Sequence, residues 1–291
     1  MPPLFVAEIS SNHNQDIDRC LRFVDVAAAI GCGAVKFQLF TVADLFAPEI
    51  LAASARHRAR RAYELPVSFL PAIAGRCRQR GVLFGCTPFS LAAVEQLAGY
   101  VDFLKIASYE LLWPPLGAAC AATGLPVMLA TGLADLAEVA GAVENLRRAG
   151  CPEPTLLHCV SAYPLPPGEA NLAAIDSLRR AFGLPVGWSD HSRCPGVIHR
   201  AVHRFGAEVV ELHLDLEGEG REYGAGHCWL PGELAECIRD VAAGLAADGD
   251  GIKACAPCEA PDRDWRADPH DGLRPLRRVR AGFTGDNGGA S

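Results

Sequence analysis

The chain has 291 residues, half of them apolar, and a formal net charge of −7 at pH 7. This length suits one large domain with a well-buried core. The acidic balance, with a pI near 5.7, argues against a nucleic-acid-binding protein, because phosphate backbones select basic surfaces.

The N-terminus gives no sign of a leader or an anchor. Met1 is followed by Pro-Pro-Leu-Phe-Val-Ala-Glu, without a basic segment leading into an apolar one, and no apolar stretch approaches the roughly 18 residues of a membrane span. We therefore expect a cytoplasmic protein without membrane contact. Most of the 12 cysteines are expected to be reduced and buried, and the Cys255–Cys258 pair is assigned no role because no second ligand pair lies nearby.

Short apolar segments alternate with stretches of helical period along most of the chain. The first helical stretch begins at Asp16, a residue type that caps helices. Strands are predicted at residues 4–9, 34–40, 82–87, 103–108, 126–131, 155–160, 186–190 and 209–214. Helices are predicted at 16–30, 67–80, 90–98, 115–122 and 135–149, with a further helical stretch after each later strand.

This alternation predicts the fold class. Apolar strands joined by crossover helices indicate a parallel sheet covered on both faces, and eight repeats favour closure into a single-domain (β/α)8 TIM barrel over an open doubly wound sheet. No Gly-x-Gly-x-x-Gly follows the first strand, which argues against a dinucleotide-binding fold. We expect the barrel to occupy residues 1–248.

Two segments fall outside the repeat. Residues 41–66 contain the basic run Arg56–Arg61 and are interpreted as a long connection on the active-site side of the barrel. Residues 249–291 are rich in proline, glycine and charge, and are expected to form a tail that is flexible toward its end.

Two lysines stand inside predicted strands, Lys36 and Lys105, where an ammonium group without a partner is costly to bury. They either form structural ion pairs with strand-end glutamates such as Glu8 or Glu110, or bind a phosphate or carboxylate of a ligand. In a parallel barrel the reactive groups gather at the carboxyl ends of the strands, and the position of both lysines there favours the ligand.

Other polar residues also fall at strand ends. They are Asn12, His13, Gln38, Thr87, Ser108, Thr131, His158, Tyr163, Ser189, Asp190, His191, Glu211 and His213. His191 and His213 end neighbouring strands, and imidazole suits divalent transition ions, so the pair predicts a metal site with Asp190 and Glu211 as orienting groups. The alternative is one loop-capping and one core histidine. The strand-end hydroxyls either contact the ligand or cap the following helices.

Seven motifs in order are similar to those of the N-acetylneuraminate (sialic acid) synthase family over residues 4–245. They are Ala7-Glu-Ile-Ser-Ser-Asn-His-Asn, Val35-Lys-Phe-Gln, Cys86-Thr-Pro-Phe, Lys105-Ile-Ala-Ser-Tyr-Glu, Leu157-His-Cys-Val-Ser-Ala-Tyr-Pro, Trp188-Ser-Asp-His-Ser and Glu211-Leu-His. The resemblance implies a carbon–carbon bond-forming transferase that joins phosphoenolpyruvate to an N-acylated hexose or related aldose. The products would be a nonulosonic, sialic-acid-like acid and phosphate.

The resemblance also implies roles for single residues. The phosphoenolpyruvate site would comprise Lys36, Gln38, Thr87, Lys105, Ser108, Thr131 and Ser189. The sugar site would comprise Ser161, Tyr163 and Glu211, and the catalytic groups would be Glu8, Lys36, Lys105 and Glu110. His191 and His213 would hold Mn2+ or Mg2+, which polarises the aldehyde of an open-chain sugar such as N-acetylmannosamine while the methylene carbon of phosphoenolpyruvate attacks it.

Several positions depart from the family pattern. Family members usually carry a C-terminal antifreeze-like (SAF) domain that lends an arginine to the partner subunit's sugar site, and the sequence ends before such a domain, so this contact is expected to be missing. A homodimer remains the default expectation. Ser161, Leu212 and Gly226 replace residues expected near the sugar, and Ala130 replaces a serine near the phosphate.

Two alternatives stay open. One is another 3-deoxy-ulosonate synthase acting on a different aldose or a sugar phosphate, whose second phosphate the Arg56–Arg61 run would receive; otherwise that run is a solvated helix face. The other is a barrel that binds a sugar acid without turnover. The presence of Lys36, Lys105, His191 and His213 together favours an enzyme.

Overall fold

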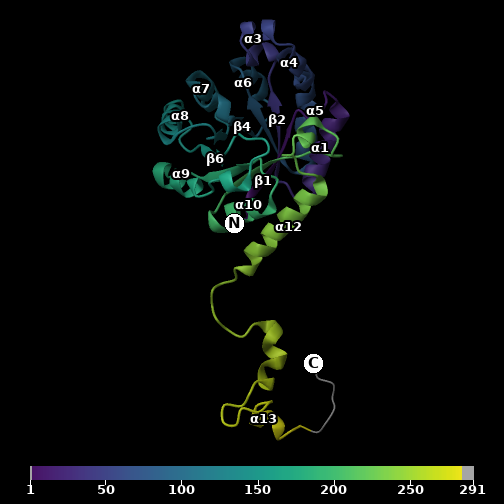
Figure 1. Ribbon diagram of the computed structural model, residues 1–291, viewed down its shortest axis with the longest axis vertical. Coiled ribbons are helices and arrows are strands. Elements are labelled where there is room, and N and C mark those ends of the chain that lie inside the picture. The colour runs from purple at the N-terminus through teal and green to yellow at the C-terminus, as the bar shows by residue number, and fades with distance from the viewer. Residues whose placement is uncertain (1, 284–291) are drawn as a thin grey trace. The chain divides into compact units, whose positions relative to one another are not determined.

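Eight parallel strands form a closed barrel in the computed structural model, which describes residues 2–283 (Figure 1). The strands are β1 (Leu4–Ser10), β2 (Ala34–Leu39), β3 (Leu83–Pro88), β4 (Phe103–Ile106), β5 (Val127–Ala130), β6 (Thr155–Cys159), β7 (Val186–Asp190) and β8 (Val209–His213). Each strand pairs with its neighbours in sequence, and β1 pairs with β8. The predicted (β/α)8 TIM barrel is confirmed.

Helices cover the outside of the barrel. They are α1 (Ile17–Ala29), α5 (Leu70–Arg80), α6 (Leu91–Leu97), α7 (Pro114–Ala122), α8 (Leu136–Arg148), α9 (Ala174–Phe182), α10 (Pro195–His199), which continues as a π-helical turn over Arg200–Arg204, and α12 (Pro231–Ala247). The side chain of Asp16 caps α1, as expected, and Asp135 and Glu138 form a capping box at α8. The apolar faces of the helices pack on the strands in one large core. Among residues 2–283, none of the helices has the length and apolar character that crossing a bilayer requires.

A layer of mostly apolar side chains closes the interior of the barrel. It consists of Val6, Ala34, Phe103, Met128, Ala130, Leu157, Cys159 and Val209. Inward-facing residues recur at every second position of a strand, so the next inward residues are polar. These are Glu8 after Val6, Lys36 after Ala34, Lys105 after Phe103 and Glu211 after Val209. The alternation places a polar rim directly on an apolar floor.

Two glycines make room for this floor. A Cβ added at Gly85 would lie 2.0 Å from the Phe103 ring, and one at Gly187 would lie 2.5 Å from the carbonyl oxygen of Val209. Both glycines precede a polar rim residue by two positions, namely Thr87 and Ser189. The interior therefore stays narrow enough for side chains of opposite strands to touch.

The connection between β2 and α5 is built from short helices. They are α2 (Val42–Leu45), α3 (Pro48–Ala53), α4 (Ala55–Arg58) and 3₁₀ turns at Ala59–Tyr63 and Val67–Phe69. The Arg56–Arg61 run thus crosses from α4 into a 3₁₀ turn. After β8, a second long connection contains α11 (Arg221–Gly224), so the barrel carries two elaborated loops at its carboxyl end.

Residues from Ala247 onward form a second compact unit. Its described part holds a 3₁₀ segment at Pro257–Trp265 and α13 (Arg277–Arg280), with Asp271 accepting hydrogen bonds from Arg280. The segment expected to be a plain tail therefore has local structure. The expectation of flexibility toward its end concerns residues 284–291, which lie outside the described residues. All 12 cysteines are free thiols, and Cys255 and Cys258 are exposed.

Candidate active site

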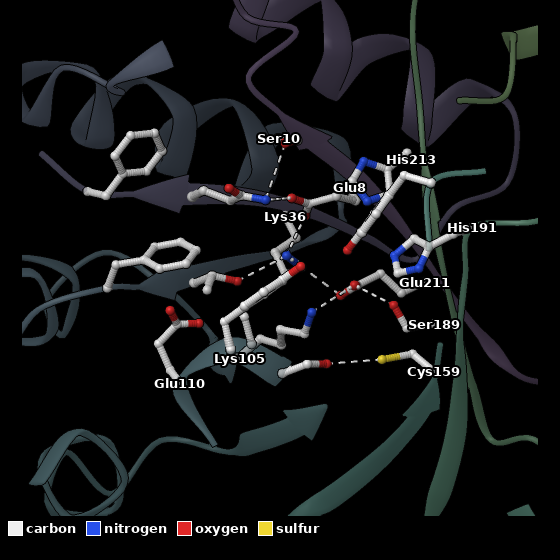
Figure 2. Close-up of a pocket in the computed structure, with 18 of the residues that line it drawn as sticks. Glu8, Ser10, Lys36, Lys105, Glu110, Cys159, Ser189, His191, Glu211 and His213 are labelled. Atoms are coloured by element: carbon white, nitrogen blue, oxygen red, sulfur yellow. Dashed lines mark hydrogen bonds and ion pairs between the residues drawn. The ribbon is translucent and has the colours of Figure 1, made fainter. Parts of the chain in front are cut away.

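A cavity of about 560 Å³ opens at the carboxyl ends of the strands (Figure 2). It brings together most of the residues singled out in the sequence. They are Glu8, Lys36, Gln38, Thr87, Lys105, Ser108, Glu110, Tyr163, Ser189, His191, Glu211 and His213. Thr131 and Ser161 are not among its lining residues, and the Thr131 hydroxyl donates to the carbonyl oxygen of Leu157 instead. Seven of the eight strands thus contribute side chains to one cavity. These side chains belong to the strands themselves or to residues that follow the strand ends.

Two lysines and two glutamates form a buried ionic network at its base. Lys36 forms an ion pair with Glu8 and also donates to Thr87 Oγ1 at 3.0 Å. Its Nζ lies 3.6 Å from Oε2 of Glu211, and Nζ of Lys105 lies 3.1 Å from Oε1 of the same carboxylate. The structural ion pair considered from the sequence therefore exists for Lys36 and Glu8. The partner of Lys105 is Glu211 rather than Glu110.

The network keeps its groups charged despite their burial. Burial alone would raise the pKa of Glu211, but the charges of Lys105 and Lys36 outweigh it and hold this pKa well below its usual range. Burial likewise disfavours a charged Lys36, yet Glu211 and Glu8 raise its pKa above the ordinary value. Two positive and two negative charges thus balance before any ligand enters.

Two histidines face each other beside this network, with ring centroids 5.4 Å apart (Figure 2). Nδ1 of His191 lies 2.8 Å from the carbonyl oxygen of Val160, which can only accept, so Nδ1 carries the proton. Burial, followed by the proximity of His213, lowers the pKa of His191 to about 3. His191 is therefore neutral, and its Nε2 has no hydrogen-bond partner among the described residues.

His213 is oriented by a carboxylate that the sequence reasoning missed. Its Nδ1 lies 3.2 Å from Oε2 of Glu222, in α11, and Glu222 also accepts hydrogen bonds from the backbone and hydroxyl of Ser11. Burial would raise the pKa of Glu222, but the hydrogen bonds from His213 and His227 hold it well below its usual value. His227 and Cys228 lie beside this carboxylate. The signal available in the sequence was the closely spaced Glu222, His227 and Cys228 after a strand that ends in histidine.

Glu110 occupies a different environment. It lines the cavity from the 3₁₀ turn Ser108–Glu110, and its Oε2 has no hydrogen-bond partner among the described residues. Burial raises the pKa of Glu110 to about 7, although the charge of Lys105 acts in the opposite direction. This carboxyl group can therefore hold or release a proton near neutral pH.

The connection after β2 reaches the cavity with Leu45, Phe46 and Arg60. The guanidinium of Arg60 lies 5.5 Å from the centre of the Phe46 ring, and no carboxylate among the described residues forms an ion pair with it. Arg60 therefore presents to the cavity a positive charge without a carboxylate partner among the described residues. The interpretation of 41–66 as a connection on this side of the barrel agrees with its position.

Comparisons with known proteins agree on one family. A family profile described as "NeuB family" matches residues 23–253. The N,N'-diacetyllegionaminic acid synthase of Campylobacter jejuni is 32% identical over 272 residues, covering 88% of this chain and 80% of that protein. An uncharacterised protein of Methanocaldococcus jannaschii is 33% identical over 97% of this chain and 81% of its own length. The N-acetylneuraminic acid synthetase structure from Leptospira borgpetersenii, solved with citrate, superposes with a TM-score of 0.79 at 29% identity and 90% coverage of both chains.

Proposed function

Because this chain belongs to the NeuB family, and is thereby an enzyme that forms a carbon–carbon bond with phosphoenolpyruvate, we propose that it condenses phosphoenolpyruvate with an N-acylated hexose or related aldose. The products are a nonulosonic acid and inorganic phosphate. The observation that carries the proposal is the single cavity in which two buried lysines and two facing histidines meet.

The lysines and hydroxyls form the end of the cavity that suits phosphoenolpyruvate. Lys36, Lys105 and Ser189 hydrogen-bond to carboxylates of the network, so they are held in place before the ligand arrives. Ser108 is held by the backbone N–H of Gly132 at 3.1 Å. Such preorganised donors suit the carboxylate and phosphate groups of phosphoenolpyruvate, with Gln38 and Thr87 completing the pocket.

The histidine pair fits a divalent metal ion. Hydrogen bonds at Nδ1 fix both rings and leave both Nε2 atoms without a hydrogen-bond partner among the described residues, so both are available as metal ligands. A bound ion would act as a Lewis acid on the aldehyde oxygen of the sugar. The proposed ion is Mn2+ or Mg2+.

The remaining groups position the substrates and move protons. The carboxylate of Glu8 accepts from Gln38 at 2.7 Å and pairs with Lys36, which fixes it at the centre of the cavity. The methylene carbon of phosphoenolpyruvate bonds to the aldehyde carbon, whose oxygen takes up a proton. Water adds to the neighbouring carbon, loses a proton, and phosphate then leaves. Glu110 can exchange one of these protons at neutral pH, and Tyr163 flanks the sugar.

Arg60 favours a second candidate, a synthase whose aldose carries a phosphate or another acidic group. The guanidinium, which lacks a carboxylate partner among the described residues, would pair with that group, whereas a neutral N-acyl hexose offers it no charge. Both candidates share the carbon–carbon bond formation and differ only in the sugar.

We further propose a cytoplasmic enzyme that acts without nucleic acid or membrane, with the catalytic barrel in residues 1–248 and a separate segment from 249 onward. A homodimer is the default assembly. The unit boundary near Ala247 supports the division of the chain.

The experiment measures phosphate release from phosphoenolpyruvate by the full chain with Mn2+. The aldose panel contains N-acetylmannosamine, other N-acylated hexoses, plain aldoses and their phosphates, and each reaction is repeated with His191→Ala. Release that requires one aldose, the metal and His191 supports the proposal and identifies the sugar. Folded protein that binds a sugar acid but releases no phosphate with any aldose would instead favour a binding protein.

A further inference from the structure

A cluster of metal-ligating side chains lies around Nδ1 of His213, and Glu222 and His227 of this cluster also line the cavity. It is formed by His213, Glu222, His227 and Cys228, whose donor atoms all lie within 4.8 Å of one another. His213 ends β8, and the other three come from the connection between β8 and α12. His191, the other histidine of the proposed metal pair, is not part of this cluster.

The distances from Glu222 to the other three members are close to those between ligands around one ion. Oε2 of Glu222 lies 3.2 Å from Nδ1 of His213, 3.8 Å from Nε2 of His227 and 4.0 Å from Sγ of Cys228. Tetrahedral zinc with bonds of about 2.0–2.3 Å has ligand atoms roughly 3.3–3.8 Å apart. The distance to Nε2 of His227 exceeds an ordinary hydrogen bond, and the distance to Sγ of Cys228 is that of a weak hydrogen bond from the thiol.

Burial adds an independent observation. His227 is 5% exposed and its Nδ1 has no hydrogen-bond partner in the described part of the chain, while its Nε2 lies 3.8 Å from Oε2 of Glu222. An unpaired buried imidazole costs free energy that a bound ion would offset. Cys228 is fully buried, and its sulfur accepts a hydrogen bond from the side-chain amide of Asn12 at 3.7 Å.

We propose that Glu222, His227, Cys228 and Nδ1 of His213 form a second metal site, which takes a thiophilic divalent ion of the Zn2+ type. A carboxylate, two imidazoles and a thiol are a donor set for zinc or cobalt, and four protein ligands make a closed site of the structural kind. The ion would fix the connection after β8 against β1 through Ser11 and Asn12. This site goes beyond the proposed Nε2 pair of His191 and His213, because it needs neither His191 nor a substrate. The ion would take the place of the proton that Nδ1 of His213 shares with Glu222, and that proton would pass to solvent.

The test is Co2+ binding followed by absorption, with a chelator-treated full chain in which Cys255→Ser and Cys258→Ser remove the exposed thiol pair. We expect a thiolate-to-cobalt charge-transfer band together with intense visible bands of tetrahedral cobalt. Cys228→Ser should abolish the charge-transfer band, and His227→Ala should weaken Co2+ binding by roughly tenfold or more. Cys237→Ser, a buried cysteine outside the cluster, is the matched control and should keep the band.

His191→Ala separates this proposal from the proposed function, since it should stop phosphate release but retain the sulfur–cobalt band. The full chain with Cys255→Ser and Cys258→Ser is the reference protein. If this protein is folded and binds Co2+ without the thiolate-to-cobalt band, the proposal is overturned. It is also overturned if the band persists after Cys228→Ser. If Cys228→Ser does not fold, X-ray absorption of the zinc-loaded reference protein decides. A sulfur neighbour at about 2.3 Å supports the site, and a shell of only nitrogen and oxygen overturns it.

Discussion

Nζ of Lys105 lies 3.1 Å from Oε1 of Glu211, and the hydroxyl of Ser189 donates to that same oxygen at 3.0 Å. One carboxylate thus holds two of the groups proposed to bind phosphoenolpyruvate. An anionic ligand would bind Lys36 and Lys105, whose charges Glu8 and Glu211 neutralise in the ligand-free protein. We therefore expect ligand binding to be coupled to the stability of this network.

Glu211→Gln should therefore destabilise the ligand-free protein and increase its response to anions. Removing one partner of a buried ion pair costs about 3–5 kcal/mol, because the other charge stays buried. Calorimetry should show a lower Tm and a larger stabilisation by phosphoenolpyruvate than in the unmodified protein. Glu144→Gln, in an exposed pair with Arg148, should change stability by less than about 0.5 kcal/mol. Equal responses of both variants to phosphoenolpyruvate would contradict the coupling.

Glu110→Gln should change the pH dependence of stability. The pKa of Glu110 rises from 4.5 to about 7 on folding, so the folded chain binds the extra proton between these values. Stability should therefore fall as the pH rises from about 4.5 to 7, and stay lower above that range. Glu110→Gln cannot titrate at this position, so its free energy of unfolding should not show this fall with pH. Urea unfolding of both proteins at pH 5 and pH 8 measures the difference. A difference between the two proteins that is the same at both pH values would argue against the raised pKa.

Arg60→Ala should distinguish acidic from neutral aldoses. If the guanidinium receives an acidic group of the sugar, its loss should raise KM for that aldose roughly tenfold while KM for phosphoenolpyruvate stays unchanged. Arg56→Ala is the matched control, since Arg56 belongs to the same basic run but does not line the cavity. Equal effects of the two changes would assign the run to a solvated surface.

Gly187→Ala should destabilise the barrel, because its Cβ would lie 2.5 Å from a backbone oxygen of the next strand. Overpacking of this kind costs about 1–3 kcal/mol. Gly141→Ala, in α8, meets no atom within 4 Å and should stabilise by about 0.5–1 kcal/mol through helix propensity. Urea unfolding of both variants measures the difference, and a neutral Gly187→Ala would mean that β8 can move aside.

The sequence was sufficient for the barrel and for much of the cavity, because period-two alternation places Lys36 and Lys105 on the same face as the apolar residues Ala34 and Phe103 two positions before them. It was not sufficient for the partner of Lys105, since Glu110 is near in sequence whereas Glu211 meets it only across the closed barrel. Glu222 was missed for the same reason. Its contact with Ser11 joins residues 211 positions apart, and the spacing of Glu222, His227 and Cys228 alone does not indicate that contact.

The pairing of β1 with β8 sets the order in which the enzyme can be completed during its synthesis. Glu8 lies in register with His213, so the first and last strands meet at the cavity itself. At about 5–20 residues per second, a ribosome needs roughly 10–40 s to proceed from β1 to β8. Throughout that time the edge of β1 that later binds β8 has no partner within the nascent chain. The cavity is therefore completed in the same step in which β8 pairs with β1 and covers this strand edge.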